Sequence, residues 1–436
     1  MRNLKFNEVI NVAAHMLTRG RLLKKTPFYS LDEMQHWQLN RIREGVEHAY
    51  AHIPFYHDHY TEAGFKPGDL KSWDDFRRLP CVTKDQVIAN YPQRMLRSGF
   101  NLDELIVSRS SGSSGKVLDI AYDSTAMMTF VLAGLRLYKM CFTYRPWHKQ
   151  AYVYTSPYPM NSLMGLYPLH FLSTLTPVNE ILATLKKLKP ELLVCYPSHL
   201  RQIVQAATAG DLAAIRPRAV SVNSEMSTQA ERDYLSAQLQ CPVLDEYSSE
   251  ELTRIAAQCC HKTYHLFEDI NYMETLDANG RQTGGVGTLV GTNLHNTAMP
   301  MIRYQQNDLG KIEETDCACG WKFRRLLNFE GRRNDSFVLP SGKLLSSGFL
   351  LDATYDFLLN HRTAIRDFCL IQRNQTQISL QVVPGEGWSG NVSQSISARF
   401  QEFLEPAVKF EIQVVEQCEK TRTGKRNPII NLMNRT

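Results

Sequence analysis

The sequence predicts an α/β fold: a large N-terminal domain in which mixed sheets layer with helices, followed by a small α+β domain. Two observations support this fold class. Short apolar runs that are typical of buried strands, at 192–196 and 219–222, alternate with helical stretches along the chain. Near the C-terminus, residues 410–414 instead alternate apolar and polar side chains, as in a half-buried strand. We therefore expect two domains, at residues 1–330 and 331–436.

Length and composition agree with a globular protein of more than one domain. The chain has 436 residues, of which 43% are hydrophobic and 21% are charged. Its formal net charge is only +5, and it contains no long block of like charges. This pattern argues against nucleic-acid binding or a role at a membrane surface, and a small anionic substrate suits it better.

The N-terminal segment and the cysteines indicate the compartment. Residues 1–25 are basic and partly apolar, but polar residues interrupt the apolar core that a secretion signal needs. No apolar run approaches the length of a membrane span. The 10 cysteines make no disulfide framework, so we expect a reducing cytoplasm in which they are free thiols or metal ligands.

Helix and strand signals follow one another along the chain. Ser30 and Glu33 have capping-box spacing and open an amphipathic helix that Pro54 stops. Thr83 and Gln86 predict the start of a second helix in the same way. Beyond them we expect strands at 105–107, 192–196, 219–222 and 242–244, helices at 180–189 and 228–239, and a turn at 342–350.

A glycine- and serine-rich loop follows the strand at 105–107. Its sequence at 108–116, Ser-Arg-Ser-Ser-Gly-Ser-Ser-Gly-Lys, combines close backbone approach, hydroxyl donors and one lysine, which together suit a polyphosphate. It is not a Walker A loop, because Gly112 and Gly115 are too close together and Val117 follows the lysine. A flexible linker is the alternative, although a linker rarely lies between two apolar runs.

This loop resembles the phosphate loop of the acyl- and aryl-adenylating enzymes. The chain as a whole resembles their phenylacetate–CoA ligase branch, which includes adenylating proteins found with capsule-biosynthesis functions. The similar segments keep their order through nearly the whole chain, at 48–56, 79–84, 108–116, 223–225, 247–251, 303–308, 331–332 and 423–425. The resemblance implies an AMP-binding adenylation domain at 1–330 and a small mobile domain at 331–436.

The same resemblance implies an acid–thiol ligase that uses ATP. Such an enzyme converts a carboxylic acid, with an aromatic acid favoured, into an acyl-adenylate. It then passes the acyl group to CoA or to the phosphopantetheine arm of an acyl carrier protein. Two rivals stay open: a ligase with an amine acceptor, and a catalytically degenerate nucleotide-binding protein. A homodimer is also left open.

The resemblance assigns the nucleotide site residue by residue. The phosphate loop supplies Ser110, Ser111, Gly112, Ser113, Ser114, Gly115 and Lys116. Asp308 accepts the ribose hydroxyls, and Tyr247 lies against adenine. An ungapped match gives Mg²⁺ to Glu251, whereas a slip of one residue gives a phosphate-binding hydroxyl to Ser249 and Mg²⁺ to Glu250. Both alignments remain open.

Three further segments carry roles in the resemblance. Ser224 and Glu225 lie in the segment that lines the adenine and acyl pocket, and Arg332 lies where the two domains join. Lys425 follows Gly424 and matches the lysine that neutralises charge during adenylation. Without the resemblance these segments are a polar loop, a turn and a basic tail. The tyrosines of 152–158, with Tyr167 and Tyr196, are candidates for the acyl pocket or for the core.

Cysteines and histidines of two segments predict a closed structural zinc site. The expected ligands are Cys260, His265, Cys317 and Cys319, with Cys259 or His261 as substitutes. Members of the resembled branch can carry zinc at matching positions. Reduced thiols in a turn are the alternative, because Cys-x-Cys is a less specific signature than Cys-x-x-Cys.

Overall fold

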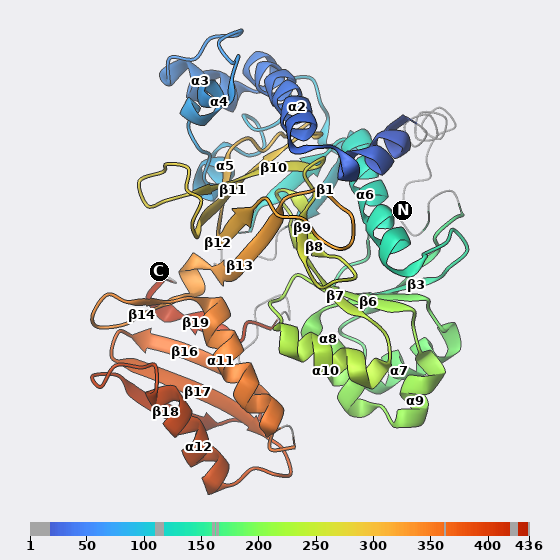
Figure 1. The fold of residues 1–436 in the computed structure, drawn as a ribbon, viewed down its shortest axis with the longest axis vertical. Coiled ribbons are helices and arrows are strands. Elements are labelled where there is room, and N and C mark those ends of the chain that lie inside the picture. Colours follow the sequence, from blue (N-terminus) through green and yellow to red (C-terminus); the bar gives the residue numbers. More distant parts are fainter. Residues whose placement is uncertain are drawn as a thin grey trace.

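The computed structural model describes residues 18–109, 117–158, 162, 165–361, 363–418 and 426–434. In this part of the chain, sheets of eleven and four strands carry the architecture, and helices are layered against them (Figure 1). The predicted α/β fold class is confirmed. Among the helices of these ranges, none combines the length and the apolarity that crossing a membrane requires.

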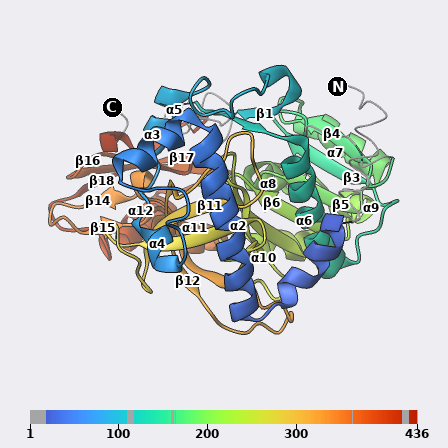
Figure 2. The same cartoon turned by 90° about the horizontal axis from the view of Figure 1, so that it is seen from above.

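Helices at the N-terminal end cover the antiparallel side of the large sheet. They are η1 (Thr26–Phe28), α2 (Leu31–His52), α3 (Pro54–Glu62), α4 (Trp73–Arg78) and α5 (Lys84–Asn90). The expected capping box opens α2, since Ser30 Oγ accepts from the Glu33 N–H and the Glu33 carboxylate accepts from the Ser30 N–H. Pro54 ends α2 because it is the first residue of α3. Seen from above, these helices lie over the strands with which they share a core (Figure 2).

The parallel half of the large sheet contains the strands predicted at 192–196, 219–222 and 242–244, together with two strands that were not predicted. In order across the sheet it contains β4 (Leu169–Ser173), β3 (Gln150–Tyr154), β5 (Leu192–Cys195), β6 (Ala219–Asn223) and β7 (Val243–Ser249). Four helices form an apolar core against one face: α7 (Val178–Leu188), α8 (Pro197–Ala206), α9 (Ala209–Ile215) and α10 (Gln229–Leu239). The other face meets α6 (Ser124–Phe142). Burial on both faces explains why β5, β6 and the start of β7 are apolar runs in the sequence.

The antiparallel half continues the same sheet from β7. Its strands, in order, are β8 (Thr253–Gln258), β9 (Tyr264–Leu266), β13 (Arg325–Arg332), β12 (Tyr304–Glu313), β11 (Gly287–Asn293) and β10 (Asn271–Leu276). A separate ribbon pairs β1 (Ile106–Arg109) with β2 (Asp119–Tyr122), after η2 (Leu102–Glu104). This ribbon holds both ends of the glycine- and serine-rich loop.

The small sheet forms from the chain that follows β13. Its strands are β18 (Lys409–Val414), β17 (Gln377–Pro384), β16 (Ile365–Asn374) and β19 (Ile429–Asn431). The same region contains η3 (Arg333–Asp335), β14 (Phe337–Val338), β15 (Leu344–Leu345), α11 (Ser347–Asn360), α12 (Gly390–Gln401) and η4 (Leu432–Asn434). It has an apolar core of its own around Phe368, Ile378 and Phe400. The last strand of the large sheet along the chain, β13, thus ends at Arg332. The division into two domains at 330/331 stays a prediction.

Candidate active site

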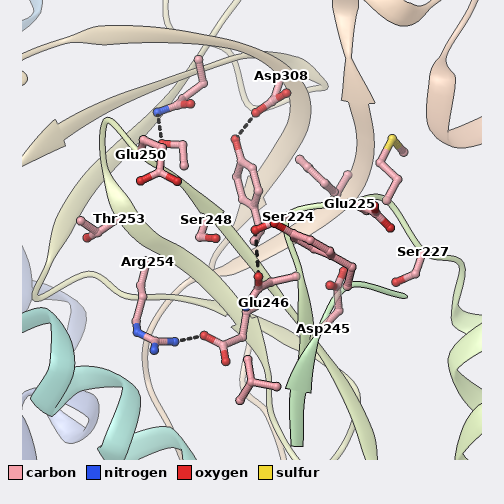
Figure 3. Close-up of a pocket in the computed structure, with 18 of the residues that line it drawn as sticks. Ser224, Glu225, Ser227, Asp245, Glu246, Ser248, Glu250, Thr253, Arg254 and Asp308 are labelled. Atoms are coloured by element: carbon pink, nitrogen blue, oxygen red, sulfur yellow. Dashed lines mark hydrogen bonds and ion pairs between the residues drawn. The ribbon is translucent and has the colours of Figure 1, made fainter. Parts of the chain in front are cut away.

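A cavity of about 1270 Å³ lies at the carboxyl ends of the parallel strands (Figure 3). Open α/β sheets bind their ligands at this edge, because the loops that follow parallel strands meet there. The walls come from β1, α6, β3, β7, β8, β12 and β13 of the large part and from residues 426–428 of the small part. Side chains of both parts therefore face one space.

Two of the segments predicted to matter most have described neighbours that line this cavity. The loop residues Ser110, Ser111, Gly112, Ser113, Ser114, Gly115 and Lys116, and also Lys425, lie outside the described residues. Their neighbours can be placed: Ser108, Arg109 and Val117 line the cavity, and so does Arg426. The ends of both segments thus meet at the same site.

Asp308 forms the centre of a polar group at one side of the cavity. It is buried, and its Oδ2 accepts a hydrogen bond of 2.5 Å from the Tyr247 hydroxyl (Figure 3). Arg332 lies opposite it in the β12–β13 register, with Nε 3.9 Å from Asp308 Oδ1. Burial raises the pKa of the Asp308 carboxyl, and the nearby Arg332 charge opposes that rise. The structure therefore brings positions 247, 308 and 332 together.

Glu250 and Glu251 differ in their surroundings. Glu251 is buried, its Oε1 accepts from the Tyr304 hydroxyl at 3.0 Å, and the same oxygen lies 3.7 Å from Lys84 Nζ. Glu250 is partly exposed, and Ser108 Oγ donates to its carboxylate. One glutamate thus belongs to the β12 side of the cavity, and the other to the strand that leads into the glycine- and serine-rich loop.

Ser249 and Ser224 also line the cavity, but their hydroxyls have local partners. Ser249 Oγ accepts a hydrogen bond of 3.0 Å from the Gln306 side chain. It also accepts one of 3.1 Å from the backbone N–H of Leu252, in the turn between β7 and β8. Ser224 is exposed at a positive φ of 66°, and its Oγ donates to Asn223 Oδ1 at 2.9 Å. The left-handed backbone at Ser224 turns the chain sharply at the end of β6.

Glu225 connects the large and the small part. Its Oε2 accepts from the Ser198 N–H at 3.2 Å, at the start of α8. Its Oε1 accepts from the backbone N–H of Arg426 at 2.9 Å. The predicted pocket residue therefore holds the main chain next to Lys425.

An ion-pair network extends this connection. Arg426 Nε lies 2.7 Å from Asp367 Oδ1 on β16, and Arg201 Nη1 of α8 lies 3.9 Å from the same oxygen. Arg201 also pairs with Glu231 on α10 and stacks its guanidinium 5.2 Å from the ring centre of Tyr355 on α11. Ion pairs thus join the large and the small part beside the cavity.

Aromatic side chains form another wall of the cavity. Tyr152 and Tyr154 stack with ring centres 4.0 Å apart, and Tyr158 meets Tyr152 edge-on at 5.7 Å. Tyr196 lies 4.4 Å from Tyr154, and Tyr167 lines the cavity as well. These tyrosines, which the sequence left between pocket and core, all have surface in the cavity.

A cluster of sulfur and nitrogen atoms lies on the antiparallel half, away from these groups. The ligand atoms of Cys259, His265, Cys317 and Cys319 all lie within 4.8 Å of one another. Cys260, which the sequence favoured as a ligand, is exposed and is not in the cluster. The correction has a simple cause: the side chains of adjacent residues point apart at the end of β8, and only that of Cys259 turns inward.

The geometry of this cluster fits a tetrahedral Zn²⁺ ion. The sulfurs of Cys259 and Cys317 are 3.8 Å apart, and Cys319 Sγ is 3.3 Å from His265 Nε2. Zn–S bonds of roughly 2.3 Å in a tetrahedron place two sulfurs about 3.8 Å apart. His265 Nδ1 lies 3.1 Å from the Phe323 carbonyl oxygen, which fixes the ring so that Nε2 is free to bind metal.

Sequence reasoning missed two functional candidates. Lys84 contacts Glu251, and it is the last residue of the 79–84 segment; the bridge between Val82 and Tyr304 positions that segment. Arg254 on β8 pairs with Glu246 on β7 in the cavity wall. Lys84 could have been found from the sequence, because it belongs to the 79–84 segment that resembles the ligase family. Arg254 had no such signal, because its partner becomes a neighbour only when the sheet forms.

No protein-family model matches the chain. In sequence it is similar to the phenylacetate-coenzyme A ligase of Escherichia coli K12, with 24% identity over 327 residues, 71% of this chain and 74% of that protein. The phenylacetate-coenzyme A ligase of Aromatoleum evansii is 26% identical over 338 residues, 71% of this chain and 73% of the relative. These relatives span most of both chains.

Solved structures share the fold. A 2-hydroxyisobutyryl-CoA ligase in its postadenylation state superposes with a TM-score of 0.79 and 20% identity, over 94% of this chain and 91% of the other. The same ligase in its thioesterification state gives a TM-score of 0.62 over 94% and 91%. A benzoate CoA ligase from Burkholderia xenovorans gives 0.53 at 14% identity, over 76% of this chain and 68% of the other. The chain is therefore a homologue of the phenylacetate-coenzyme A ligases and has the fold of the adenylate-forming acyl-CoA ligases.

Proposed function

We propose that this protein is an AMP-forming acid–thiol ligase. A carboxylate attacks the α-phosphorus of ATP, which gives an acyl-adenylate and releases pyrophosphate. A thiol then attacks the acyl carbon, a thioester forms, and AMP leaves. The observation that supports this most directly is the single cavity in which Asp308, Tyr247, Arg332 and the ends of both loop segments meet.

The nucleotide fits the polar side of this cavity. Asp308 offers carboxylate oxygens to the ribose hydroxyls, and charge-assisted hydrogen bonds of this kind are among the stronger ones. Tyr247 supplies a ring surface for adenine, and its ring packs 4.4 Å from that of Phe329. The loop at 110–116 provides backbone donors and Lys116 for the phosphates. We assign Ser224, Glu225 and Ser249 to the walls around the nucleotide.

Mg²⁺ would bind at the glutamates of 250–251. Magnesium takes one or two carboxylate ligands and fills its remaining positions with phosphate oxygens and water. Its charge would offset that of the phosphates. Paired variants distinguish the two alignments, because Glu250→Gln and Glu251→Gln should differ in the Mg²⁺ concentration that half-saturates pyrophosphate release. The true ligand is the residue whose change raises that concentration more.

Lys425 is proposed to act in adenylation only. A preorganised cation at the attacking oxygen stabilises charge that develops in the transition state. The small part is expected to rotate before thiol attack and to take Lys425 with it, a gating role that is common in enzymes. The higher TM-score against the postadenylation state agrees with a chain poised near the first half-reaction.

The decisive experiment separates the half-reactions. Lys425→Ala should slow acyl-AMP formation about 10²–10³-fold, whereas thioester formation from pre-formed acyl-AMP should continue near its normal rate. Lys420→Ala removes the same charge from the same tail and is the matched control. If Lys425→Ala adenylates normally, the assignment is wrong. If the unmutated protein binds ATP but releases no pyrophosphate with any acid, a degenerate nucleotide-binding protein is the better account.

The stacked tyrosines support a proposal for the acid, and the likeness to CoA ligases supports one for the acceptor. We propose an aromatic acid, because stacked tyrosines offer flat apolar surface for a ring. CoA or a carrier-protein phosphopantetheine is the proposed thiol. Replacing the thiol by an amine in the second half-reaction tests the rival ligase. The zinc ion is proposed to be structural, since four protein ligands would close its coordination.

A further inference from the structure

A buried ion pair lies in the cavity wall on the side of α6. Arg254 Nη1 donates to Glu246 Oε2, as Figure 3 shows. The Glu246 side chain is only 2% exposed, whereas that of Arg254 is 20% exposed. The Glu246 carboxylate is therefore buried, whereas the Arg254 guanidinium has surface in the cavity.

Glu246 has its acceptor sites filled by protein groups. Its Oε1 accepts from the hydroxyl of Tyr138 on α6 and, at 2.5 Å, from Ser221 Oγ on β6. Its other oxygen belongs to Arg254. Glu246 therefore serves to hold and balance the guanidinium, and nothing in the adenylation chemistry requires it.

The guanidinium is fixed in one place by its packing. It lies against Gly134 of α6, where an added Cβ would be 2.5 Å from Arg254 Cζ. The ring centre of Tyr138 is 5.8 Å from Cζ. Among the described residues the guanidinium pairs with Glu246 and hydrogen-bonds Tyr138, and the hydroxyls of Tyr154 and Tyr158 lie near it. Arginine has five N–H donors, so the bonds to Glu246 and Tyr138 leave donors for a ligand.

This group is separate from the nucleotide side of the cavity. Successive residues of a strand point to opposite faces, so Glu246 and Tyr247 on β7 point apart. Tyr247 meets Asp308, and Glu246 meets Arg254. In Figure 3, Asp308 lies in the upper part of the view, and Glu246 and Arg254 lie in the lower part. The stacked rings of Tyr152 and Tyr154 line the cavity together with Arg254. The result is an aromatic slot with Arg254 in its wall, and the Glu250 carboxylate also lies near Tyr152 and Tyr158.

We propose that Arg254 recognises a neutral oxygen substituent on the acyl substrate, and that the substrates are aromatic acids with a hydroxyl or ether oxygen remote from the carboxyl group. This inference rests on the proposed function. A neutral acceptor fits because Glu246 already balances the charge of Arg254. A second carboxylate would bring two negative charges to one guanidinium in a site of low exposure, which is unfavourable.

Matched acids test the inference on the unmutated protein. ATP–pyrophosphate exchange is measured with phenylacetate and its 3- and 4-hydroxy derivatives, with benzoate and its hydroxy derivatives, and with 4-carboxyphenylacetate. A site built to hydrogen-bond a substrate hydroxyl discriminates strongly against the analogue without it. We expect kcat/KM for the best hydroxylated acid to exceed that of its parent by about 10²-fold or more.

The outcomes separate this inference from the proposed function. Exchange with unsubstituted acids at equal or higher kcat/KM overturns the role of Arg254 and leaves the ligase intact. A preference for the dicarboxylate overturns the neutral class. If none of the acids supports exchange, while ATP binds, the proposed function itself fails.

Variants of the pair assign the preference to Arg254. Because Arg254→Met alone would strand a buried carboxylate, it is combined with Glu246→Gln, and Arg254→Lys is the conservative variant. The ratio of kcat/KM between hydroxylated and parent acids should fall at least about tenfold in the double variant. Ser221→Ala, which removes a donor to Glu246 but leaves Arg254, should keep the ratio. A folding defect lowers both acids alike, so an unchanged ratio in a folded double variant refutes the inference.

Discussion

Asp308 would meet the nucleotide as a buried carboxylate that already holds one hydrogen bond. The Tyr247 hydroxyl orients one of its oxygens, and Arg332 lies near the other. Such a carboxylate is preorganised, because its position does not depend on the ligand. The burial that raises its pKa also strengthens any hydrogen bond that it accepts from ribose.

Removal of this carboxylate should weaken nucleotide binding. We expect Asp308→Ala to raise the Kd for ATP about 10–100-fold, the range that charge-assisted hydrogen bonds contribute. Calorimetric titration of ATP measures it. Tyr247→Phe keeps the ring and the carboxylate, so it should cost less. An unchanged affinity for Asp308→Ala would remove this residue from the site.

The adjacent residues Cys259 and Cys260 provide a test variant and a matched control for the proposed metal site. Cys259→Ser should lower both the zinc content and the unfolding temperature, because metal binding is coupled to folding. Cys260→Ser, one residue away and exposed, should change neither. Metal analysis and thermal unfolding of both variants provide the measurement. Equal zinc content in the two variants would contradict the cluster.

The cysteine example shows what the sequence predicts at this scale and what it leaves open. Spacing located the two segments of the cysteine–histidine cluster, but it did not separate Cys259 from Cys260, since which side chain turns inward depends on how β8 ends. Motifs named Asp308 and Tyr247 as candidates. No motif named Arg254, because its partner Glu246 lies on the neighbouring strand.

At the scale of elements, the two halves of the large sheet differ in how well the sequence predicts their strands. Of the parallel strands, β5, β6 and β7 were predicted because both of their faces are buried, which makes them apolar runs. β12 was missed because its sequence, Tyr-Gln-Gln-Asn-Asp-Leu-Gly-Lys-Ile-Glu, is polar. It carries Asp308, and a local departure from the pattern that would reveal a strand is expected at a candidate functional position.

Gly331, near the end of β13, should tolerate no side chain. Its φ is +73°, and an added Cβ would lie 2.5 Å from Ser347 Oγ and 2.6 Å from Met226 Sδ. Gly331→Ala should therefore cost about 1–2 kcal/mol for the backbone and about 1–3 kcal/mol for overpacking. Gly342→Ala is the control, with a φ of +84° and no atom within 4 Å of the added Cβ.

Chemical denaturation of the two glycine variants distinguishes these costs. The control should lose only the backbone contribution, so the difference between the variants measures the packing at Gly331. That packing joins the end of β13 to the start of α11 and to the loop after β6. Equal losses in the two variants would show that the contact is not tight.

At the scale of the whole molecule, the network around Asp367 should favour the adenylating arrangement. Asp367→Ala removes the carboxylate that lies near both Arg426 and Arg201. We expect acyl-AMP formation to slow by about tenfold, since roughly 1.4 kcal/mol of interaction between the parts corresponds to that factor. Thioester formation from pre-formed acyl-AMP should change less.

A surface pair on the same sheet is the control for this network. Glu411→Ala removes the partner of Lys409 on β18, and an exposed pair of this kind contributes little. Single-turnover measurement of each half-reaction distinguishes the cases. If Asp367→Ala slows both half-reactions equally, the network supports folding rather than one arrangement of the two parts.

The contact between Glu225 and residue 426 has a consequence for how this protein tolerates change. The donor is a main-chain amide, so every amino acid except proline preserves it at position 426. Substitution of the side chain at position 426 would leave this hydrogen bond intact. In a comparison of homologous sequences, the residue at 426 would therefore not vary together with Glu225. The segment that carries Lys425 is thus secured by a group that substitution leaves in place, and Arg426→Pro is the change that would remove it.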